Sequence, residues 1–324
     1  MASLREIKDR IGSVRSTLKI TSAMKLVASA KLRKAQKAIE ALRPYESTLA
    51  EILSALPAAA PTRVAGNYFS DRFAEKPISA PPSATPAQAV ASNSALPRGS
   101  SGDMPPYQTT ATTAVVAIAS NSSLCGGFNA SVVRKALETI RGCQNGVEVY
   151  PLGRKMVEAL RRAGYTADQD YNDLVGHPSY EKSAALARRL ADRYQRGELS
   201  GVVLVYTRFV SASKQEPVAE LYLPFTGLAA GDSPVKPAND ADGDYILEPD
   251  AAALAAQLLP QVMMLKFHAA ILDSAAAEQA ARTIAMQTAT DNAEDLLGEL
   301  TLEYNKGRQQ KITAEILDLL GGAQ

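Results

Sequence analysis

The N-terminal stretch decides the fold, and its residues 4–53 read LREIKDRIGSVRSTLKITSAMKLVASAKLRKAQKAIEALRPYESTLAEIL. Apolar residues recur in it with the spacing of a heptad repeat. Two series of positions, which start at 4 and 7 and advance by seven, give sixteen heptad core positions up to residue 56, and thirteen of these are apolar. Such a sustained repeat is typical of a coiled coil. We therefore expect residues 1–56 to form one long coiled-coil helix.

The start and the interior of this helix are also marked in the sequence. Ser3 and Glu6 have the spacing of a capping box, in which each side chain hydrogen-bonds the backbone of the other residue at a helix N-terminus. Pro44 interrupts the pattern, but Leu49 and Leu53 resume the register beyond it. The sequence therefore predicts a kink at Pro44 and not the end of the helix.

A second long helix is predicted at the C-terminal end, residues 250–324. It opens at Pro249-Asp250, contains Pro260 as a kink near its start, and stops at Gly321-Gly322. Alanines recur in it at every fourth residue, at Ala277, Ala281, Ala285, Ala289 and Ala293. Small side chains let another backbone approach closely, so we expect this stripe to be a tight contact face.

The two terminal segments carry opposite charge. Residues 1–56 hold 11 Lys and Arg against 5 Asp and Glu, whereas residues 250–324 hold 5 against 10, in a chain of net charge +1. We expect the two helices to pair antiparallel. Because the second helix is longer, about 17 of its residues would overhang, roughly 25 Å at 1.5 Å per residue. This overhang, from about Tyr304 to Leu320, is apolar and implies a socket in another protein.

The middle of the chain contains two segments that differ in composition and in residue pattern. Residues 57–112 are expected to form an insertion or linker, since nine of the 18 prolines lie between 57 and 106. Residues 113–230 are expected to form a Rossmann-like α/β domain, followed by a linker at 231–249. Strands are predicted at 114–119, 147–152, 202–207 and 218–223, and helices at 129–141, 154–163 and 180–195. Their alternation predicts a mostly parallel sheet, with the last strand, bounded by Pro217 and Pro224, as an antiparallel edge.

Composition excludes several classes of protein. With 46% hydrophobic residues the chain can bury a core, and 6% aromatic residues without Trp favour helices over a β-sandwich. Two cysteines and two histidines cannot form a four-ligand zinc site without carboxylates, nor a disulfide framework, so a reducing cytoplasm is expected. We find no run of about 18 apolar residues and expect no membrane-spanning segment. The N-terminus has no apolar signal core.

Searches for an active site give little. The turn after the first domain strand, residues 121–129, lacks G-x-G-x-x-G, and no phosphate-loop motif occurs in the chain. Cys125 could be a nucleophile near a helix start, but no base accompanies it, and we interpret it as a packed small residue. His268 is interpreted as a satisfied or solvent-facing residue of the C-terminal helix, and His177 as a loop residue. The sequence therefore predicts neither an active site nor a bound cofactor or metal.

Basic residues concentrate on the N-terminal helix, at Lys25, Lys31, Arg33, Lys34 and Lys37. They could bind nucleic acid, but no aromatic residue is interleaved before Tyr45 and the acidic C-terminal helix offsets their charge. A protein partner with an acidic surface is the favoured interpretation, and a plain solvated face is the alternative. A coiled-coil scaffold and a nucleic-acid-binding protein remain the rival hypotheses for the chain as a whole.

Segments at both ends and in the middle resemble one family, the γ subunits of F-type ATP synthases. The segments that carry the resemblance are residues 7–11 (IKDRI), 19–28 (KITSAMKLVA), 43–45 (RPY), 124–129 (LCGGFN), 278–282 (EQAAR), 289–292 (ATDN) and 304–313 (YNKGRQQKIT). Two features depart from the family. Asn121, Ser122 and Ser123 stand where the family has Asp, a basic residue and Gly, and the proline-rich stretch is longer than usual.

The resemblance implies a central-stalk rotor without an active site. It implies that the coiled coil enters a ring of α and β subunits, while the domain lies on the c-ring beside the ε subunit. Met24 and Lys25 would meet β, and Arg308, Gln309 and Thr313 would make polar contacts with the ring. The apolar tip in the sleeve of the ring would comprise Ile312, Ile316, Leu317 and Leu320. The resemblance further implies a peripheral location on the cytoplasmic face of a bacterial inner membrane, with no nucleic-acid partner.

Overall fold

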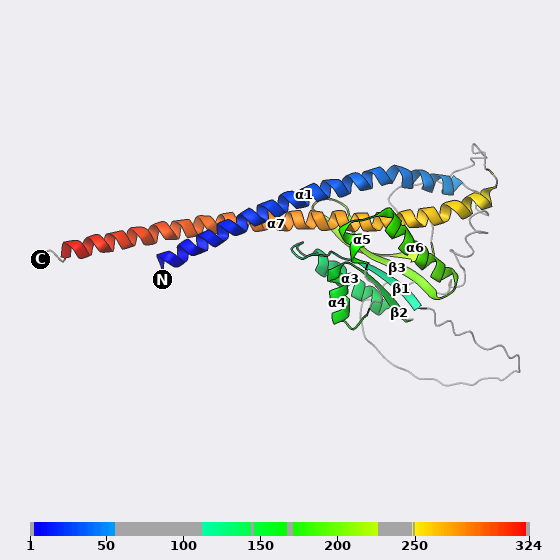
Figure 1. Ribbon diagram of the computed structural model, residues 1–324, viewed down its shortest axis with the longest axis horizontal. Coiled ribbons are helices and arrows are strands. Elements are labelled where there is room, and N and C mark those ends of the chain that lie inside the picture. The colour runs from blue at the N-terminus through cyan, green and yellow to red at the C-terminus, as the bar shows by residue number, and fades with distance from the viewer. Residues whose placement is uncertain are drawn as a thin grey trace, which may run out of the picture.

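The computed structural model describes residues 3–55, 112–143, 146–166, 171–225, 248 and 250–321. Figure 1 shows two parts: a pair of very long helices, and an α/β domain packed against the half of the pair that is remote from the C-terminus. This is the predicted fold class, a long antiparallel coiled coil with a mostly parallel α/β domain. The predicted insertion at 57–112 and the linker at 231–249 lie almost wholly outside the described residues.

Helix α1 runs from Leu4 to Ala55. The capping box is present: the Ser3 backbone N–H donates to Glu6 Oε2 at 2.9 Å, and the Glu6 N–H donates to Ser3 Oγ at 3.3 Å. Each described heptad core position from Leu4 to Leu53 is buried or half-buried, which confirms the predicted register. Pro44 lies inside the helix, so it does not end it.

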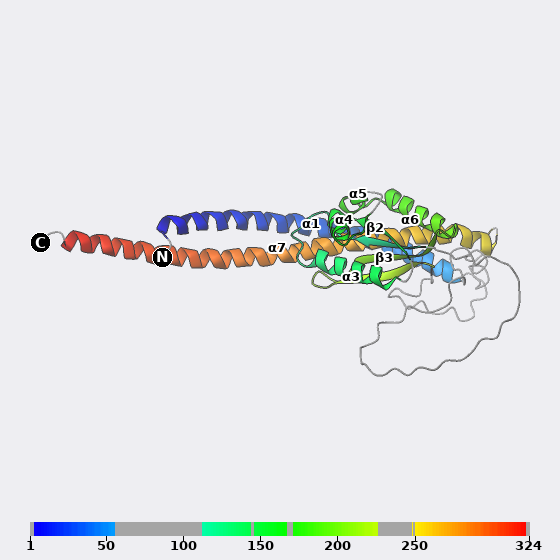
Figure 2. The ribbon, with the colours of Figure 1, turned by 90° about the horizontal axis from the view of Figure 1, so that it is seen from below.

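Helix α7 runs from Ala251 to Gly321 and includes Pro260. Asp250 caps it, because its Oδ1 accepts a hydrogen bond from the Ala253 N–H at 2.6 Å. The helix lies antiparallel to α1 (Figures 1 and 2). Thr290 Oγ1 donates to Thr21 Oγ1 at 3.0 Å across the pair. This contact marks the register of the two helices at Thr21 and Thr290.

The overhang of α7 exists but starts later than predicted. A Cβ built at Gly307 would lie 3.0 Å from Leu4 Cδ2, so the pairing still includes Gly307. Tyr304, predicted as the start of the overhang, is half-buried. The unpaired part therefore begins at Arg308, one helical turn later than predicted.

The domain contains a four-stranded sheet of order β2-β1-β3-β4. Its strands are β1 (Thr112–Ile118), β2 (Val147–Leu152), β3 (Leu199–Phe209) and β4 (Gln215–Leu223), and its helices are α3 (Phe128–Gly142), α4 (Arg154–Arg162), α5 (Asn172–Gly176) and α6 (Tyr180–Gln195). Strand β1 pairs parallel with β2 and β3, and β3 pairs antiparallel with β4. The parallel sheet and its antiparallel edge were both predicted.

The two faces of the sheet have different covers. Ala114, Val116 and Ile118 of β1 point to a core shared with α6, α7 and the C-terminal part of α1. Val115 and Ala117 point to a second core with α3 and α4. Helix α7 is thus one of the two helices of the coiled coil and also a core helix of the domain (Figure 2). Any rotation of α7 must therefore carry the domain with it.

Four details of the sequence prediction were wrong. Strand β1 starts at Thr112, one residue inside the expected insertion, and β3 is longer than predicted at both ends. Pro217 lies inside β4 and does not bound it, because an edge strand tolerates a missing N–H donor. The five-residue helix α5 was missed, since it is too short to show a helical period.

Histidine 268 and Cys125 are both buried. His268 Nδ1 lies 2.9 Å from Ser183 Oγ of α6, and the ring meets Tyr180 edge-on at a centroid distance of 5.6 Å. Burial lowers the pKa of His268 below its ordinary value. The interpretation of His268 as a satisfied residue is confirmed. The packed-residue interpretation of Cys125 is confirmed as well, since only 1% of it is exposed.

One helix of the described chain, α7 between Ala251 and Leu317, is long and apolar enough to cross a membrane by length and composition alone. This test averages hydropathy over a window, so it does not contradict the expectation, which rested on the lack of an uninterrupted apolar run. Within the apolar window of this helix, 56% of the residues are buried inside the protein. Core helices of soluble proteins pass the same test, so the property reflects the packing of α7 against α1 and the sheet.

Candidate functional site

The unpaired end of α7 is the most exposed part of the coiled coil. Side chains from Arg308 to Leu317 are all exposed. They include three apolar ones, Ile312, Ile316 and Leu317, with exposed fractions of 46%, 50% and 62%. The side chain of Leu320 lies outside the described residues. Exposed apolar residues grouped on one helix end mark an interaction surface.

The overhang is amphipathic, and its polar and apolar candidate residues share one side. At 100° per residue, the seven predicted contact residues fall within about half of the helix circumference. These are Arg308, Gln309, Ile312, Thr313, Ile316, Leu317 and Leu320. Lys311 and Glu315, an i,i+4 ion pair of 3.7 Å, project from the remaining half. The helical repeat thus places the six described candidates, Arg308 to Leu317, on one side of the helix.

Met24 and Lys25 lie at a different position along the axis of the coiled coil, which we call the Met24 level. Both are half-buried against α7, next to the Thr21–Thr290 contact. Leu4 lies beside Gly307, so Lys25 is about 30 Å along the axis from the start of the overhang at 1.5 Å per residue. The structure therefore does not bring the two groups of predicted ring-contact residues together. They form two separate candidate surfaces on one shaft.

The basic residues of α1 flank the Met24 level. Lys31, Arg33, Lys34 and Lys37 are exposed, and Lys25 is half-buried. Apolar neighbours in the same region, Ile20, Leu26 and Val27, are 60%, 70% and 55% exposed. A surface that mixes cations with exposed apolar side chains is suited to an acidic protein partner. The acidic residues Asp291, Glu294 and Asp295 of α7 are also exposed.

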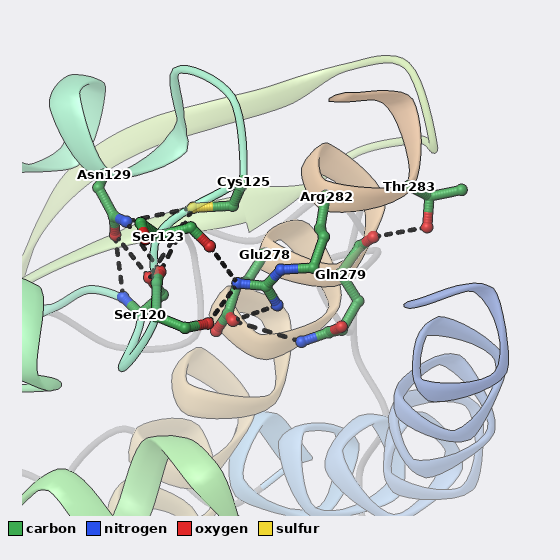
Figure 3. A network of polar contacts seen from close by, with 9 residues as sticks. Ser120, Ser123, Cys125, Asn129, Glu278, Gln279, Arg282 and Thr283 are labelled. Carbon is green, nitrogen blue, oxygen red and sulfur yellow. Dashed lines mark hydrogen bonds and ion pairs between the residues drawn. The ribbon is translucent and has the colours of Figure 1, made fainter. Parts of the chain in front are cut away.

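A third feature joins the domain to α7, and the sequence prediction assigned it no role. Arg282 is 8% exposed and its Nη1 donates to Glu278 Oε1 at 2.7 Å, one turn earlier on α7. Its Nη2 donates to Ser122 Oγ at 2.8 Å and to the Ser123 carbonyl oxygen at 3.5 Å. Figure 3 shows this side chain reaching from α7 to the segment between β1 and α3. We call Glu278, Arg282 and Ser122 the polar clamp.

Burial shapes the electrostatics of the polar clamp. Burial raises the pKa of the Glu278 carboxyl, and the positive charges of Arg282 and Lys31 oppose that rise. An ion pair with side chains only 10% and 8% exposed has little water to replace a lost partner. The polar clamp is therefore a strong constraint while both charges are present.

The segment that Arg282 contacts, residues 120–127, is held to the domain by its own hydrogen bonds; we call it the junction loop. Asn129 Oδ1 accepts from the Ser120 N–H at 3.1 Å, and Asn129 Nδ2 lies 3.1 Å from Cys125 Sγ (Figure 3). Asn121 Oδ1 accepts from the Arg154 N–H at 3.0 Å. These bonds tie the junction loop to α3 and α4.

Apolar packing completes the contact between the junction loop and α7. Cys125 and Phe128 pack on Ala277, with Ala281 beside them. Gly126 has φ of +58°, and a Cβ there would lie 3.7 Å from Ala285 Cβ. The predicted alanine stripe is thus a tight contact face, and over Ala277, Ala281 and Ala285 its partner is the junction loop. The neighbouring Ala276 and Ala280 pack on Leu32 of α1.

The comparisons with known proteins agree on one family. The sequence profile of the ATP synthase family matches residues 3–324. The ATP synthase gamma chain of Bacteroides fragilis is 42% identical over 328 residues, covering 100% of this chain and 99% of the relative. The chain belongs to the ATP synthase gamma-chain family. The gamma chain of Bacteroides thetaiotaomicron is 40% identical over 334 residues, with the same coverage.

A solved structure confirms the fold of this gamma-chain family member. A chain in the OSCP/F1/c-ring structure of the Euglena gracilis mitochondrial ATP synthase matches with a TM-score of 0.58 and 16% identity, covering 99% of this chain and 93% of that one. As a gamma chain, the protein is a non-catalytic subunit of ATP synthase. Among the described residues, no group of three or more His, Cys, Asp or Glu is placed to hold a metal ion.

The departure from the gamma-chain pattern at residues 121–123 has a structural outcome. Asn121 and Ser122, which replace the usual charged pair, still make contacts: Asn121 binds the start of α4 and the Asn172 carbonyl, and Ser122 binds Arg282. A signal for the polar clamp was present in the sequence. Glu278 and Arg282 are charged residues at i and i+4 within the alanine stripe, a position where charge must be paired.

Proposed function

We propose that this chain is the rotating shaft that couples ion flow through a membrane-embedded c-ring to ATP synthesis or hydrolysis in a ring of α and β subunits. The observation that carries the proposal is the unpaired, amphipathic end of α7, which lies at the opposite end of one continuous helix from the domain. A helix that is rigid, eccentric and exposed at its tip is suited to enter a ring and to turn in it.

The upper contacts follow from the two candidate surfaces. Arg308, Gln309 and Thr313 would hydrogen-bond the surrounding β subunits, since all three are exposed. Ile312, Ile316, Leu317 and Leu320 would occupy an apolar sleeve formed by the ring. An apolar bearing supplies burial without directional bonds, so the tip can turn without breaking hydrogen bonds.

Met24 and Lys25 would form the lower contact with the moving acidic segment of β. Their level of the coiled coil is flanked by Lys31, Arg33 and Lys34, so the shaft presents positive charge there. The charge differs around the circumference, because the exposed acids of α7 lie on the partner helix. Each of the three β subunits would therefore meet a different face of the shaft at a given angle.

This asymmetry provides the mechanism of coupling. A shaft face that binds one β conformation better than the others stabilises it by the difference in binding free energy. Rotation moves that face to the next β subunit, and the nucleotide affinity of each site changes in turn, which is a linkage between distant sites. The gamma chain itself contributes no cofactor and no reacting group.

The opposite end would meet the membrane-side components. The α/β domain is the part of the chain remote from the tip (Figure 1), and we infer that it rests on the c-ring beside the ε subunit. The chain would then be a peripheral protein on the cytoplasmic face of the bacterial inner membrane. No nucleic-acid partner is proposed, because the basic surface has an assigned protein partner.

Site-specific photo-crosslinking in the assembled complex tests the proposal. A benzophenone maleimide attached at Leu317→Cys, in a Cys143→Ser background, should cross-link the chain to α or β. The matched probe at Arg161→Cys, exposed on α4 of the domain, should give no α or β adduct. Equal labelling of the ring from both positions, or no ring adduct from Leu317→Cys in purified complex, would overturn the proposed orientation.

A further inference from the structure

The polar clamp lies at the point where α7 changes its surroundings. Between Leu259 and Ile271, α7 belongs to the domain core. From Thr290 to Gly307, the described contacts of α7 are with α1. Among the described contacts between the domain and α7, that of Gly126 with Ala285 lies furthest towards the tip. Arg282 is less than one turn before this last contact.

We propose that Arg282 and Ser122 are positioning residues that set the angle of the α/β domain relative to the coiled coil when torque passes between them. The inference rests on the proposed rotor function and assigns a mechanical role to a contact within this chain. The remaining contact of the junction loop is apolar, through Cys125, Phe128 and Ala277. Apolar contacts resist separation, but they are not directional and allow sliding.

Hydrogen bonds from a guanidinium are charge-assisted and directional, and Arg282 itself is buried although Ser122 is exposed. Arg282 cannot relieve a load by changing rotamer, because Nη1 is held by Glu278 on the same helix at 2.7 Å while Nη2 holds the junction loop. A small rotation of the domain about α7 would therefore stretch the bond to Ser122. The polar clamp resists twist at the junction loop, as the Tyr222 hydroxyl bound to the Met263 carbonyl at 2.9 Å and the Ser183–His268 contact at 2.9 Å do nearer the domain core.

The far side of the polar clamp is connected to the sheet. Ser120 Oγ donates to the Ser122 carbonyl oxygen at 2.5 Å, and Ser120 itself follows β1 directly. Asn121 binds the first turn of α4 and the backbone at Asn172. A load on Ser122 is thus passed to β1, α4 and α5, and through them to the whole domain.

The neighbouring serine supplies a matched control. Arg282 contacts Ser122 through its side-chain hydroxyl but contacts Ser123 through its main-chain carbonyl. Ser122→Ala therefore removes one of the two hydrogen bonds, whereas Ser123→Ala removes neither. Ser122→Thr keeps the hydroxyl, and its added methyl group fits because Ser122 is exposed. Comparison of the three variants distinguishes the effect of losing the Arg282–Ser122 hydrogen bond from the effect of changing any side chain in the junction loop.

The experiment is single-molecule observation of the assembled complex, with the α/β ring fixed to a surface and a probe attached to the domain. The measured quantity is the angular variance of the probe during catalytic pauses. With Ser122→Ala it should rise, up to roughly twofold if the two hydrogen bonds act as equal parallel springs. Ser123→Ala and Ser122→Thr should keep the wild-type variance, and ATP hydrolysis should be unchanged in all three variants.

Two outcomes would overturn different statements. Equal variance in Ser122→Ala and Ser123→Ala, or failure of Ser122→Thr to restore the wild-type variance, would overturn the role of the polar clamp and leave the rotor function intact. An ATP-hydrolysing wild-type complex whose probe does not rotate would overturn the proposed function, and the torque-bearing role with it. A thermal unfolding midpoint equal to wild type confirms that each variant is folded.

Discussion

Removing the Arg282 side chain should destabilise the protein severely, because it leaves Glu278 buried without its partner. Glu278 and Arg282 have side chains 8% and 10% exposed. Deleting one member of a buried ion pair costs about 3–5 kcal/mol, since the remaining charge has neither water nor a counter-ion. The lost bond to Ser122 is part of this cost. We expect Arg282→Ala to lower the free energy of unfolding by about this amount at pH 7.5.

The sign of the pH effect follows from the pKa of Glu278. Burial already raises that pKa, and loss of Arg282 removes the main effect that opposes the rise. A carboxyl whose pKa is higher in the folded state than in the unfolded state stabilises the protein as the pH falls through the folded pKa. The loss of unfolding free energy caused by Arg282→Ala should therefore be smaller at pH 5 than at pH 7.5.

Urea unfolding of the full-length chain, followed by circular dichroism at both pH values, measures these quantities. The double variant Arg282→Ala/Glu278→Gln has no buried charge and should recover most of the lost stability. Arg161→Ala, a change at an exposed arginine of α4, should alter stability by less than about 0.5 kcal/mol. A deficit below about 1 kcal/mol for Arg282→Ala, or no recovery in the double variant, would refute the reasoning.

Four further predictions concern packing, coupling, titration and the insertion. Ala285→Leu should lower the free energy of unfolding by about 1–3 kcal/mol through a clash with the junction loop at Gly126, while Ala314→Leu, exposed on the overhang, should leave it unchanged in urea titrations. Arg308→Ala should reduce coupled ATP synthesis in inverted vesicles with unchanged helix content; wild-type synthesis would contradict the contact. Burial raises the pKa of Asp273 to about 6, so the stability that this carboxyl contributes should be lost as the pH rises from about 4 to about 6, and the difference in unfolding free energy between wild type and Asp273→Asn should change over that range in urea titrations. Deletion of residues 78–104 should leave assembly with the α and β subunits intact in a pull-down, and its loss would assign this stretch a partner.

The coiled coil was predictable because its signal is local and periodic. Whether a residue of a helix is buried depends on its position within the helical repeat. The heptad positions of α1 could therefore be assigned without knowledge of any partner. The capping box at Ser3 and Glu6 was predictable for the same reason, since it depends on residues within one turn. The sequence also predicted a mostly parallel sheet with an antiparallel edge, but the order of its strands came from the structure.

The register between the two helices was not predictable to one turn. The predicted overhang started at Tyr304 because the estimate used only the lengths of the two helices. The structure starts it at Arg308, because Gly307 still packs beside Leu4, and the offset between two helices depends on contacts along their whole length. Similarly, the spacing of Ala277, Ala281 and Ala285 predicted a tight contact face without identifying its partner. The junction loop, more than 150 residues earlier in the sequence, supplies that partner.

The sequence by itself determined the two long helices, the alternation that builds the parallel sheet, the excess length of α7 and the family. These follow from local periodicity, from capping within one turn and from motifs that survive in order along the chain. Only the tertiary structure decided that Arg282 binds Ser122, 160 positions away, and that Asp273 lies in a site where burial raises its pKa. Side-chain hydrogen bonds and desolvation depend on which distant groups meet, and a linear pattern does not record those distances.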